Sequence, residues 1–214
     1  MKKNYKIILC AAVVLLAVLG AVLWYLESSG WWVARQAASG DLSDRIEAVA
    51  LLRGKGGSLA RETLLRLSED KELRVALAAV RAMGAHEAHR EALVRICAKG
   101  DRGLVRAAAV AALGKFEDTP SADLIAILKT DKDPVVRAGA VEGLAHKRDA
   151  QTTEALLAAM DDNDLTVRRK AMAALYRSMG LRFLYRPDDP RLKRRADIAK
   201  IRRLIRQIVA GVHR

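Results

Sequence analysis

The sequence predicts an all-α fold: an α-solenoid of about five stacked helix pairs, preceded by one transmembrane helix. One pattern recurs along the chain with steps of 31, 30, 31 and 31 residues, so that positions 45, 76, 106, 137 and 168 are equivalent. Apolar residues in each copy follow helical spacing, and aromatic residues make up only 4% of the chain. A fixed period near 31 residues with this composition is typical of helical repeats that bury their apolar faces on one another.

The amino-terminal segment predicts a membrane anchor. Residues 7–26 form an uncharged run of 20 residues. As a helix, such a run spans about 30 Å, the thickness of the hydrocarbon core of a bilayer. Three lysines lie in the basic cytoplasmic start, residues 1–6, whereas only Glu27 follows the run closely. Because this asymmetry keeps the amino terminus inside, we expect a single-pass signal anchor in a bacterial inner membrane, with the repeats on the extracytoplasmic or periplasmic side.

A cleaved signal peptide is the alternative interpretation of the same segment. Its apolar core would cover residues 7–19, with a small-residue cleavage site near Gly20. The uncharged run continues through Trp24 and Tyr25, whose amphipathic rings favour the membrane interface. This length favours an anchor that is not cleaved.

The repeat region, residues 31–180, predicts one helix pair per copy. Residues 31–41 supply the first helix of the first pair, so almost no linker separates the stack from the anchor. Asp, Asn and Thr in the loops accept hydrogen bonds from the free amides of helix starts, and Pro134 suits a first helical turn. We expect the remaining first helices over residues 57–68, 86–99, 121–129 and 151–160, and second helices beginning near Asp44, Leu73, Gly103, Pro134 and Leu165.

The carboxyl-terminal segment, residues 181–214, predicts a basic capping helix that begins at Pro190 and ends near Val212. Its apolar residues fall on one face, which would cover the last repeat: Ile198, Ile201, Ile205, Ile208 and Val212. The segment holds 11 basic and 3 acidic residues, whereas residues 27–180 hold 24 and 22. The basic face could contact anionic lipid or an acidic partner through Arg194, Arg195, Arg202 and Arg203. Export across the membrane argues against nucleic acid as a partner.

The repeats beginning Asp133-Pro-Val-Val-Arg137 and Asp164-Leu-Thr-Val-Arg168 resemble HEAT repeats, most closely the bacterial phycobilisome-lyase HEAT-like group. The resemblance covers about residues 31–180. It implies a structural ladder of aspartates and arginines between neighbouring repeats. Its matching residues here are Asp101 with Arg106, Asp133 with Arg137, and Asp164 with Arg168. Ala76 stands at the arginine position of the second repeat, which puts the ladder in doubt there.

The sequence predicts no enzyme and no cofactor. It contains one His-Glu pair, His86-Glu87, whereas a di-metal site needs ligands that converge from several helices. The glycine-rich stretch 53–57 lacks the spacing and the preceding strand of a phosphate-binding loop. Cys97 falls among apolar residues at helical spacing and is expected to be a small buried hydrophobe. We therefore predict neither a catalytic nor a metal site.

The leading functional hypothesis is a membrane-anchored scaffold that binds a protein partner on the concave face of the stack. Curved helix stacks present extended surfaces, and their second helices line the inside. Residues expected there are Arg81, Glu142, Arg169 and Lys170. The alternative is an accessory subunit of an envelope enzyme or transport complex, whose anchor also contacts partner helices. A repeat-fold enzyme is a third class, and it would require a metal or a cofactor.

Overall fold

The computed structural model describes residues 15–22, 30–180 and 182–212. Within these ranges every regular element is helical. The first helices of the pairs are α2 (Trp31–Gln36), α4 (Ser58–Ser68), α6 (Arg90–Lys99), α8 (Ser121–Thr130) and α10 (Ala150–Ala159). The second helices are α3 (Leu42–Leu52), α5 (Leu73–Met83), α7 (Gly103–Leu113), α9 (Pro134–Leu144) and α11 (Leu165–Met179). A short 3-10 turn, η1 (Glu87–His89), precedes α6, and α12 (Arg191–Val212) ends the chain.

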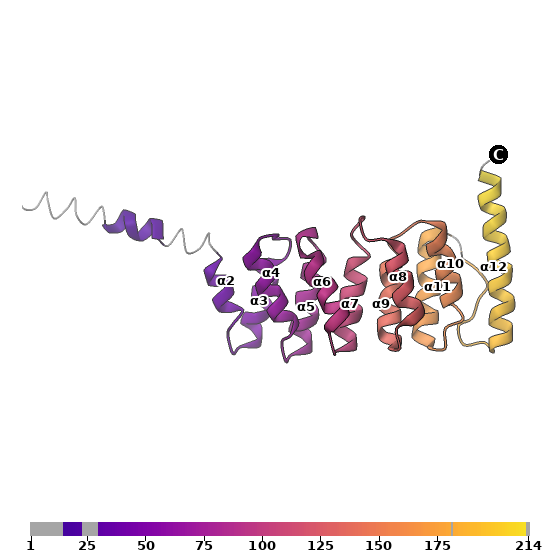
Figure 1. The fold of residues 1–214 in the computed structure, drawn as a ribbon, viewed down its shortest axis with the longest axis horizontal. Helices are drawn as coiled ribbons and strands as arrows, with labels where there is room; N and C mark the ends of the chain where they lie inside the picture. Colours follow the sequence, from indigo (N-terminus) through magenta and orange to yellow (C-terminus); the bar gives the residue numbers. More distant parts are fainter. Residues whose placement is uncertain (1–14, 23–29, 181, 213–214) are drawn as a thin grey trace, which may run out of the picture.

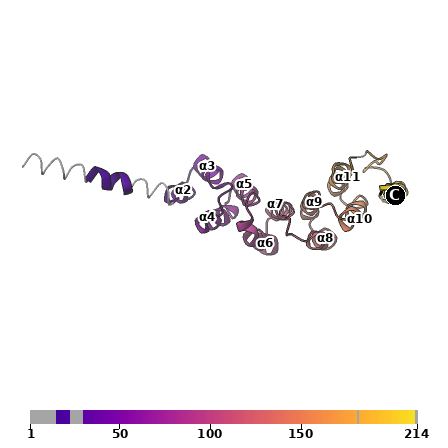
Figure 2. The same cartoon turned by 90° about the horizontal axis from the view of Figure 1, so that it is seen from above.

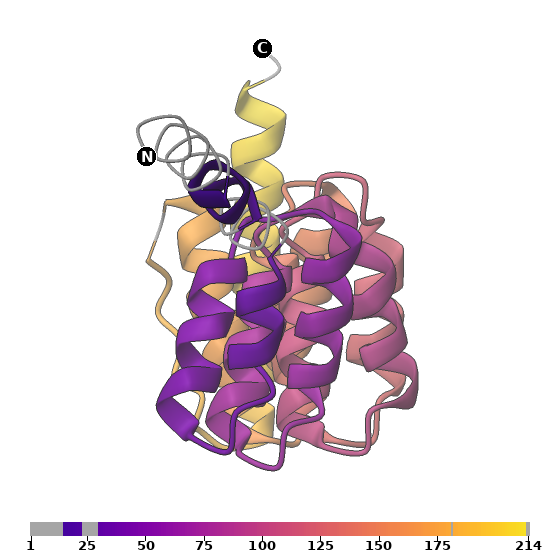
Figure 3. The ribbon, with the colours of Figure 1, turned by 90° about the vertical axis from the view of Figure 1, so that its left-hand side faces the viewer.

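The helix pairs stack side by side into a curved two-layer solenoid (Figure 1). Seen from above, the second helices form one row and the first helices the other, and the row of second helices lies on the inside of the curve (Figure 2). A view along the stack superposes successive pairs and shows α12 extending beyond them (Figure 3). The α-solenoid fold predicted from the 31-residue period is therefore confirmed.

The predicted anchor falls largely outside the described residues. The basic start and residues 7–14 and 23–26 belong to that part, whereas residues 15–22 are helical. Among the helices that the structure describes, none combines the length and the apolar character needed to cross a bilayer.

Side-chain caps fix where several second helices begin. Asp41 Oδ1 accepts a hydrogen bond from Ser43 N at 2.7 Å, and Asp133 Oδ1 accepts one from Val135 N at 2.9 Å. Asp164 caps α11 in the same way. A cap of this kind satisfies amides that have no partner inside the helix. Because Asp41 is the cap, α3 begins at Leu42, two residues before the predicted start, whereas the other second helices begin at the predicted residues.

Two clusters of buried side chains form the core between the layers. Leu64, Val80 and Leu93 belong to the cluster of the first repeats, and Leu156 and Leu175 to that of the last ones. Each such side chain contributes roughly 1.5–3 kcal/mol when it leaves water completely. Burial raises the pKa of the Cys97 thiol to about 12, so this residue packs as a neutral hydrophobe.

Glycines bring α7 and α9 into close contact. A Cβ atom added to Gly139 would lie 2.4 Å from the Ala107 carbonyl oxygen, and one on Gly114 would lie 2.2 Å from the Cα of Gly143. Real Cβ atoms do not approach so closely, so these positions accept only glycine without a shift of the backbone. These small residues therefore let α7 and α9 pack closely in the inner row of the stack (Figure 2).

The last helix covers the open end of the stack. Ile198, Ile201 and Ile205 of α12 are buried in the second core cluster, and Ile208 is half-buried. The connection before α12 is held by Tyr176 Oη, which donates a hydrogen bond to the Phe183 carbonyl at 2.7 Å. The side chain of Val212, also predicted to join this contact, lies outside the described residues.

Candidate functional site: the arginine ladder and the concave groove

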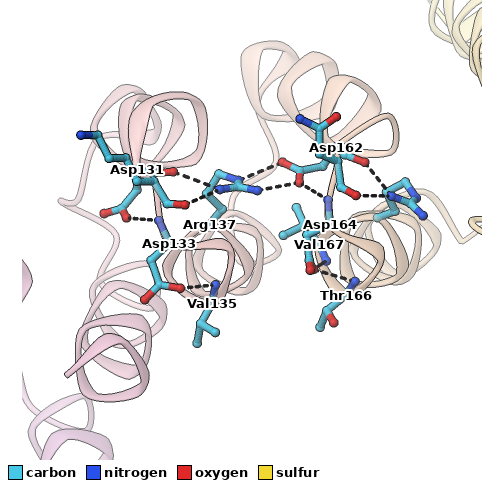
Figure 4. Close-up of polar contacts among 11 residues, drawn as sticks. Asp131, Asp133, Val135, Arg137, Asp162, Asp164, Thr166 and Val167 are labelled. Carbon is cyan, nitrogen blue, oxygen red and sulfur yellow. Dashed lines mark hydrogen bonds and ion pairs between the residues drawn. The ribbon is translucent and has the colours of Figure 1, made fainter. Parts of the chain in front are cut away.

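An arginine ladder links consecutive repeats along one end of the second helices (Figure 4). Arg137 donates from Nε and Nη2 to the two carboxylate oxygens of Asp162, at 2.9 and 2.8 Å. Arg106 forms the equivalent pair with Asp131, 25 residues further along the chain. Arg45 lies 2.8 Å from Asp70. Each pair joins a second helix to the loop that precedes the next second helix.

Arg45, Arg137 and Arg168 also bind the loop of their own repeat. Arg137 Nη1 donates to the carbonyl oxygens of Asp131 and Lys132 at 3.1 and 3.2 Å. Arg168 Nη1 donates to those of Asp162 and Asn163 at 2.8 and 2.9 Å. One planar guanidinium therefore fixes two successive loops, a geometry that lysine could not reproduce.

The pairing of Arg137 with Asp162 shifts the pKa values of both partners. The hydrogen bond with Asp162 raises the pKa of Arg137, although burial opposes this. Burial of Asp162 disfavours its charged form, but the hydrogen bonds from Arg137 and from Asp164 N outweigh that effect and lower its pKa. Both charges are therefore retained at neutral pH in a half-buried position.

The aspartates of the ladder are not the ones that the HEAT resemblance assigned. The partners are Asp131 and Asp162, two residues before Asp133 and Asp164. The carboxylates of Asp133 and Asp164 instead cap α9 and α11, so they turn toward the amides of their own helices and away from the arginines (Figure 4). Asp101 is exposed, and no ion pair joins it to Arg106 among the residues that the structure describes.

One rung of the ladder is missing between the second and third repeats. Ala76 replaces the arginine, and Gly100 stands where the next loop would carry the aspartate. A Cβ on Gly100 would lie 2.7 Å from the Ile96 carbonyl oxygen and 3.0 Å from Cγ of Arg106. Arg102 instead donates from Nη1 to the Asp70 carbonyl oxygen at 2.5 Å. The third repeat thus reaches back to the loop that an arginine at position 76 would have held.

The second helices line a groove of about 940 Å³ on the concave face. Its floor is made of small residues, among them Ala78, Ala108, Ala111 and Gly139. Toward the amino-terminal halves of the helices lies an apolar edge, formed by Ile46, Leu77, Leu104 and Val135. At their carboxyl-terminal ends lies a basic edge, formed by Arg53, Arg81, Lys115, His146 and Arg177. Because the repeat gives successive second helices one orientation, both edges run along the stack.

Three of the four residues predicted for the concave face line this groove. They are Arg81, Glu142 and Lys170, and Lys170 Nζ lies 2.6 Å from Glu142 Oε1, which neutralises both charges. The prediction for Arg169 is corrected: it does not line the groove and lies 3.3 Å from Asp188 in the loop before α12. The sequence reasoning missed Arg53, Lys115, His146 and Arg177, although all five residues of the basic edge lie at or just beyond a helix end.

Most basic residues of α12 form ion pairs within the fold, and these pairs involve three of the four arginines for which a contact with lipid or an acidic partner was predicted. Arg194 is 9% exposed and donates to Asp161 Oδ1 at 2.9 Å. Arg195 lies 2.7 Å from the same carboxylate, and Arg202 lies 2.7 Å from Glu154. Only Arg203 of the four predicted residues is exposed without an ion pair in the described part of the chain. These pairs join α12 to Glu154 of α10 and to Asp161, which follows α10.

The candidates for metal chemistry do not form a cluster. His89 is buried, and its Nε2 donates to the Lys55 carbonyl oxygen at 2.7 Å. His86 Nδ1 accepts a hydrogen bond from Ala88 N at 3.1 Å. Throughout residues 15–22, 30–180 and 182–212, no three His, Cys, Asp or Glu side chains lie close enough together to hold a metal ion.

Comparison with known proteins agrees with the geometry. Residues 121–203, from α8 into α12, match the HEAT repeats family. No curated protein matches the chain. The match and the repeating helix pairs together support a HEAT-repeat protein with an α-solenoid fold. The fold is typical of scaffolds that hold other proteins and is not typical of enzymes.

Proposed function

We propose that this protein is a membrane-anchored HEAT-repeat scaffold that binds a protein partner in the concave groove. The observation that carries the proposal is the groove itself, which crosses the second helices and exposes apolar side chains. Leu104 is 50% exposed, Ile46 40% and Val135 38%. Apolar side chains gathered on a concave surface are typical of sites that another molecule covers. HEAT repeats commonly mediate such protein interactions.

The arginine ladder supports this function by keeping the groove rigid. Each rung joins one second helix to the next loop, and Arg102 links the second and third repeats where the rung is missing, so neighbouring repeats are held together before a partner arrives. A preformed surface loses less conformational freedom on binding than a mobile one does. The ladder is therefore a structural device that serves the groove.

The composition of residues 7–26 supports anchoring in a bacterial inner membrane, with the repeats on the extracytoplasmic side. Only residues 27–30 separate that run from α2, so a partner bound in the groove would be held close to the bilayer. Among HEAT-repeat proteins, the Asp-x-x-Val-Arg pattern favours a relationship to the phycobilisome-lyase HEAT-like group. The pattern supports no pigment chemistry.

Photo-crosslinking in native membranes tests the function. Benzoylphenylalanine is placed at Leu104 in the groove or at Val94 on α6 in the outer layer, because both side chains are 50% exposed. We expect a discrete protein adduct from Leu104 and none from Val94. Equal labelling from the two positions, or labelling from Val94 alone, would contradict a groove-binding scaffold. The identity of the adduct also distinguishes a scaffold from an accessory subunit of an envelope enzyme or transport complex.

A further inference from the structure

The basic edge of the groove carries charges that the fold itself does not neutralise. Arg53, Arg81, Lys115 and Arg177 are exposed, and none of them forms an ion pair with another described residue. The remaining member, His146, has its pKa lowered, first by burial and then by the nearby charges of Lys115, Arg177 and Lys147. The positive charges of Lys115, Arg177 and Lys147 therefore lie near one another around His146.

Some cations outside the groove, among them Lys71, Lys129 and Arg203, are also exposed without an ion pair to a described residue, whereas others are paired. The ladder arginines pair with aspartates, Arg194 and Arg195 pair with Asp161, and Lys170 pairs with Glu142. Unpaired cations in a row repel one another and contribute nothing to folding, apart from a modest interaction with the helix carboxyl ends. The positive charges of the basic edge can therefore be neutralised by the anionic groups of a bound partner.

We propose that the groove binds an acidic amphipathic helix of another protein, with its carboxylates on the basic edge and its apolar face on the apolar edge. This inference rests on the proposed function and specifies the chemistry of the partner. The two edges are parallel, as are the acidic and apolar faces of an amphipathic helix. The floor of alanine and glycine lets the partner approach the second helices closely.

The spacing of the repeats fits such a helix. Packed helices lie about 8–10 Å apart, so Arg53, Arg81 and Lys115 at the ends of successive second helices place cations about 8–10 Å apart along the stack. In an α-helix, residues seven positions apart share a face and lie about 10.5 Å apart. Acidic residues at i, i+7 and i+14 would therefore meet cations of successive repeats.

The groove fits nucleic acid and lipid less well. Proteins that hold single strands stack bases on aromatic side chains, and the lining residues of this groove contain no Phe, Tyr or Trp. A planar bilayer surface cannot reach the floor of a concave groove. The exposed apolar residues and the basic edge on opposite sides of the groove match a protein helix that has one apolar face and one acidic face.

The test measures binding of a defined probe to the full chain in nanodiscs of zwitterionic lipid. The probe is a fluorescein-labelled 22-residue helix of Glu, Leu and Ala, with the glutamates seven residues apart on one face. A peptide with Lys in place of Glu and a scrambled peptide of the same composition are the controls. We expect the acidic helix to bind, the other two to bind at least about tenfold more weakly, and the affinity to fall as salt is raised.

A matched pair of double variants locates the site. Arg81→Glu with Lys115→Glu reverses two charges of the basic edge, whereas Lys71→Glu with Lys129→Glu reverses two exposed charges outside the groove. Both variants change the net charge equally. We expect the first to weaken binding about tenfold or more and the second to change it less than about twofold. Melting temperatures of both should stay close to that of the parent.

Each contrary result overturns the inference. If both double variants weaken peptide binding equally, the acidic helix is held by nonspecific electrostatic attraction. If the Lys peptide binds as tightly as the Glu peptide, charge complementarity does not determine binding. If an oligonucleotide or phosphatidylglycerol vesicles bind more tightly than the acidic helix through Arg81 and Lys115, the partner is a nucleic acid or a lipid surface and not a protein helix. If the acidic helix does not bind while Leu104 still gives its native adduct, the inference fails and the scaffold stands. If both are absent, both proposals fail.

Discussion

Arg137 and Asp162 form a bidentate ion pair across consecutive repeats, with both N···O distances below 3 Å. The two side chains are 16% and 14% exposed, so solvent screens their interaction only in part. The same guanidinium holds the carbonyl oxygens of its own loop. Buried pairs with this number of hydrogen bonds fix geometry more reliably than they add net stability, and removing one member leaves the other without a partner.

Arg137→Ala should lower the free energy of unfolding by about 1–3 kcal/mol, because Asp162 and two loop carbonyls lose their donors. Urea unfolding of the full chain in nanodiscs, followed by circular dichroism, measures the change. Arg203→Ala is the matched control, because this arginine is exposed and has no described ion pair. An Arg137 variant as stable as the control would show that the pair is only a surface contact.

The corrected assignment of the ladder gives a second prediction. Asp162→Ala should destabilise the fold by about 1–3 kcal/mol, because it leaves Arg137 half-buried and unpaired. Asp101→Ala should change stability by less than about 0.5 kcal/mol, as surface substitutions usually do. The same unfolding assay compares the two. If the variant at Asp101 proves to be the more damaging one, the partners implied by the HEAT resemblance are right after all.

Acid should destabilise the protein through the same carboxylates. Asp162 and Asp161 have lowered pKa values in the folded state, so the unfolded chain binds their protons first as the pH falls. Their contribution is therefore complete above the unfolded pKa, about 3.9, and is lost as the pH falls through the lower folded values. Melting temperatures recorded between pH 6 and pH 2.5 should fall steeply at the acid end.

Asp162→Asn is the control for this pH dependence. Since the amide does not titrate, the variant should start from a lower melting temperature at pH 6 and lose less of it on acidification. Parallel curves for the two proteins would assign the acid sensitivity to other groups.

The membrane topology is predicted from the amino-terminal residues alone. Alkaline phosphatase fused after Arg214 should be active in a bacterial host, because the lysines of residues 1–6 are expected to keep the amino terminus inside. A fusion that lacks residues 1–26 should be inactive, and it serves as the control. If the full-length fusion is inactive and a cytoplasmic reporter fused at the same position is active, the repeats lie on the cytoplasmic side and the predicted topology is wrong.

The sequence predicted the repeats well because their signals are local. Helix caps and apolar spacing lie within a few residues of each boundary, so α5, α7, α9 and α11 begin at the predicted residues. The ladder was harder because its loops carry two aspartates, as in Asp131-Lys-Asp133. Spacing alone does not tell which carboxylate caps the helix and which one faces the previous repeat. The pattern Asp-x-Asp is the signal that could have separated them.

Residues near the carboxyl terminus were mispredicted for a different reason. Exposure of Arg169 and Arg194 depends on the path of residues 182–190, which follow no repeat and offer no period to extrapolate. That path brings Asp188 to Arg169 and lays α12 along Asp161. Amphipathic spacing gave the buried face of α12 correctly, but it could not show that its basic face also meets acidic residues of the stack.

The packing of α12 predicts that this helix stabilises the last repeat. Deleting residues 190–214 removes Ile198, Ile201 and Ile205 from the second core cluster, so the last repeat would expose apolar surface to water. The truncated chain should melt at a lower temperature or aggregate, as solenoids without a terminal cap do. Ile201→Ala tests the same contact without removing any charge, and it should lower the free energy of unfolding by about 2–5 kcal/mol.

Charged residues of α12 separate capping from lipid binding. Arg194→Ala should destabilise the protein, because it leaves Asp161 with fewer donors and removes a buried contact. Arg203→Glu with Arg206→Glu should leave the melting temperature nearly unchanged, because both side chains are exposed. Differential scanning calorimetry and flotation with anionic liposomes provide the two readouts. If Ile201→Ala leaves stability intact while the exposed double variant abolishes flotation, α12 is a membrane-binding arm and does not cap the stack.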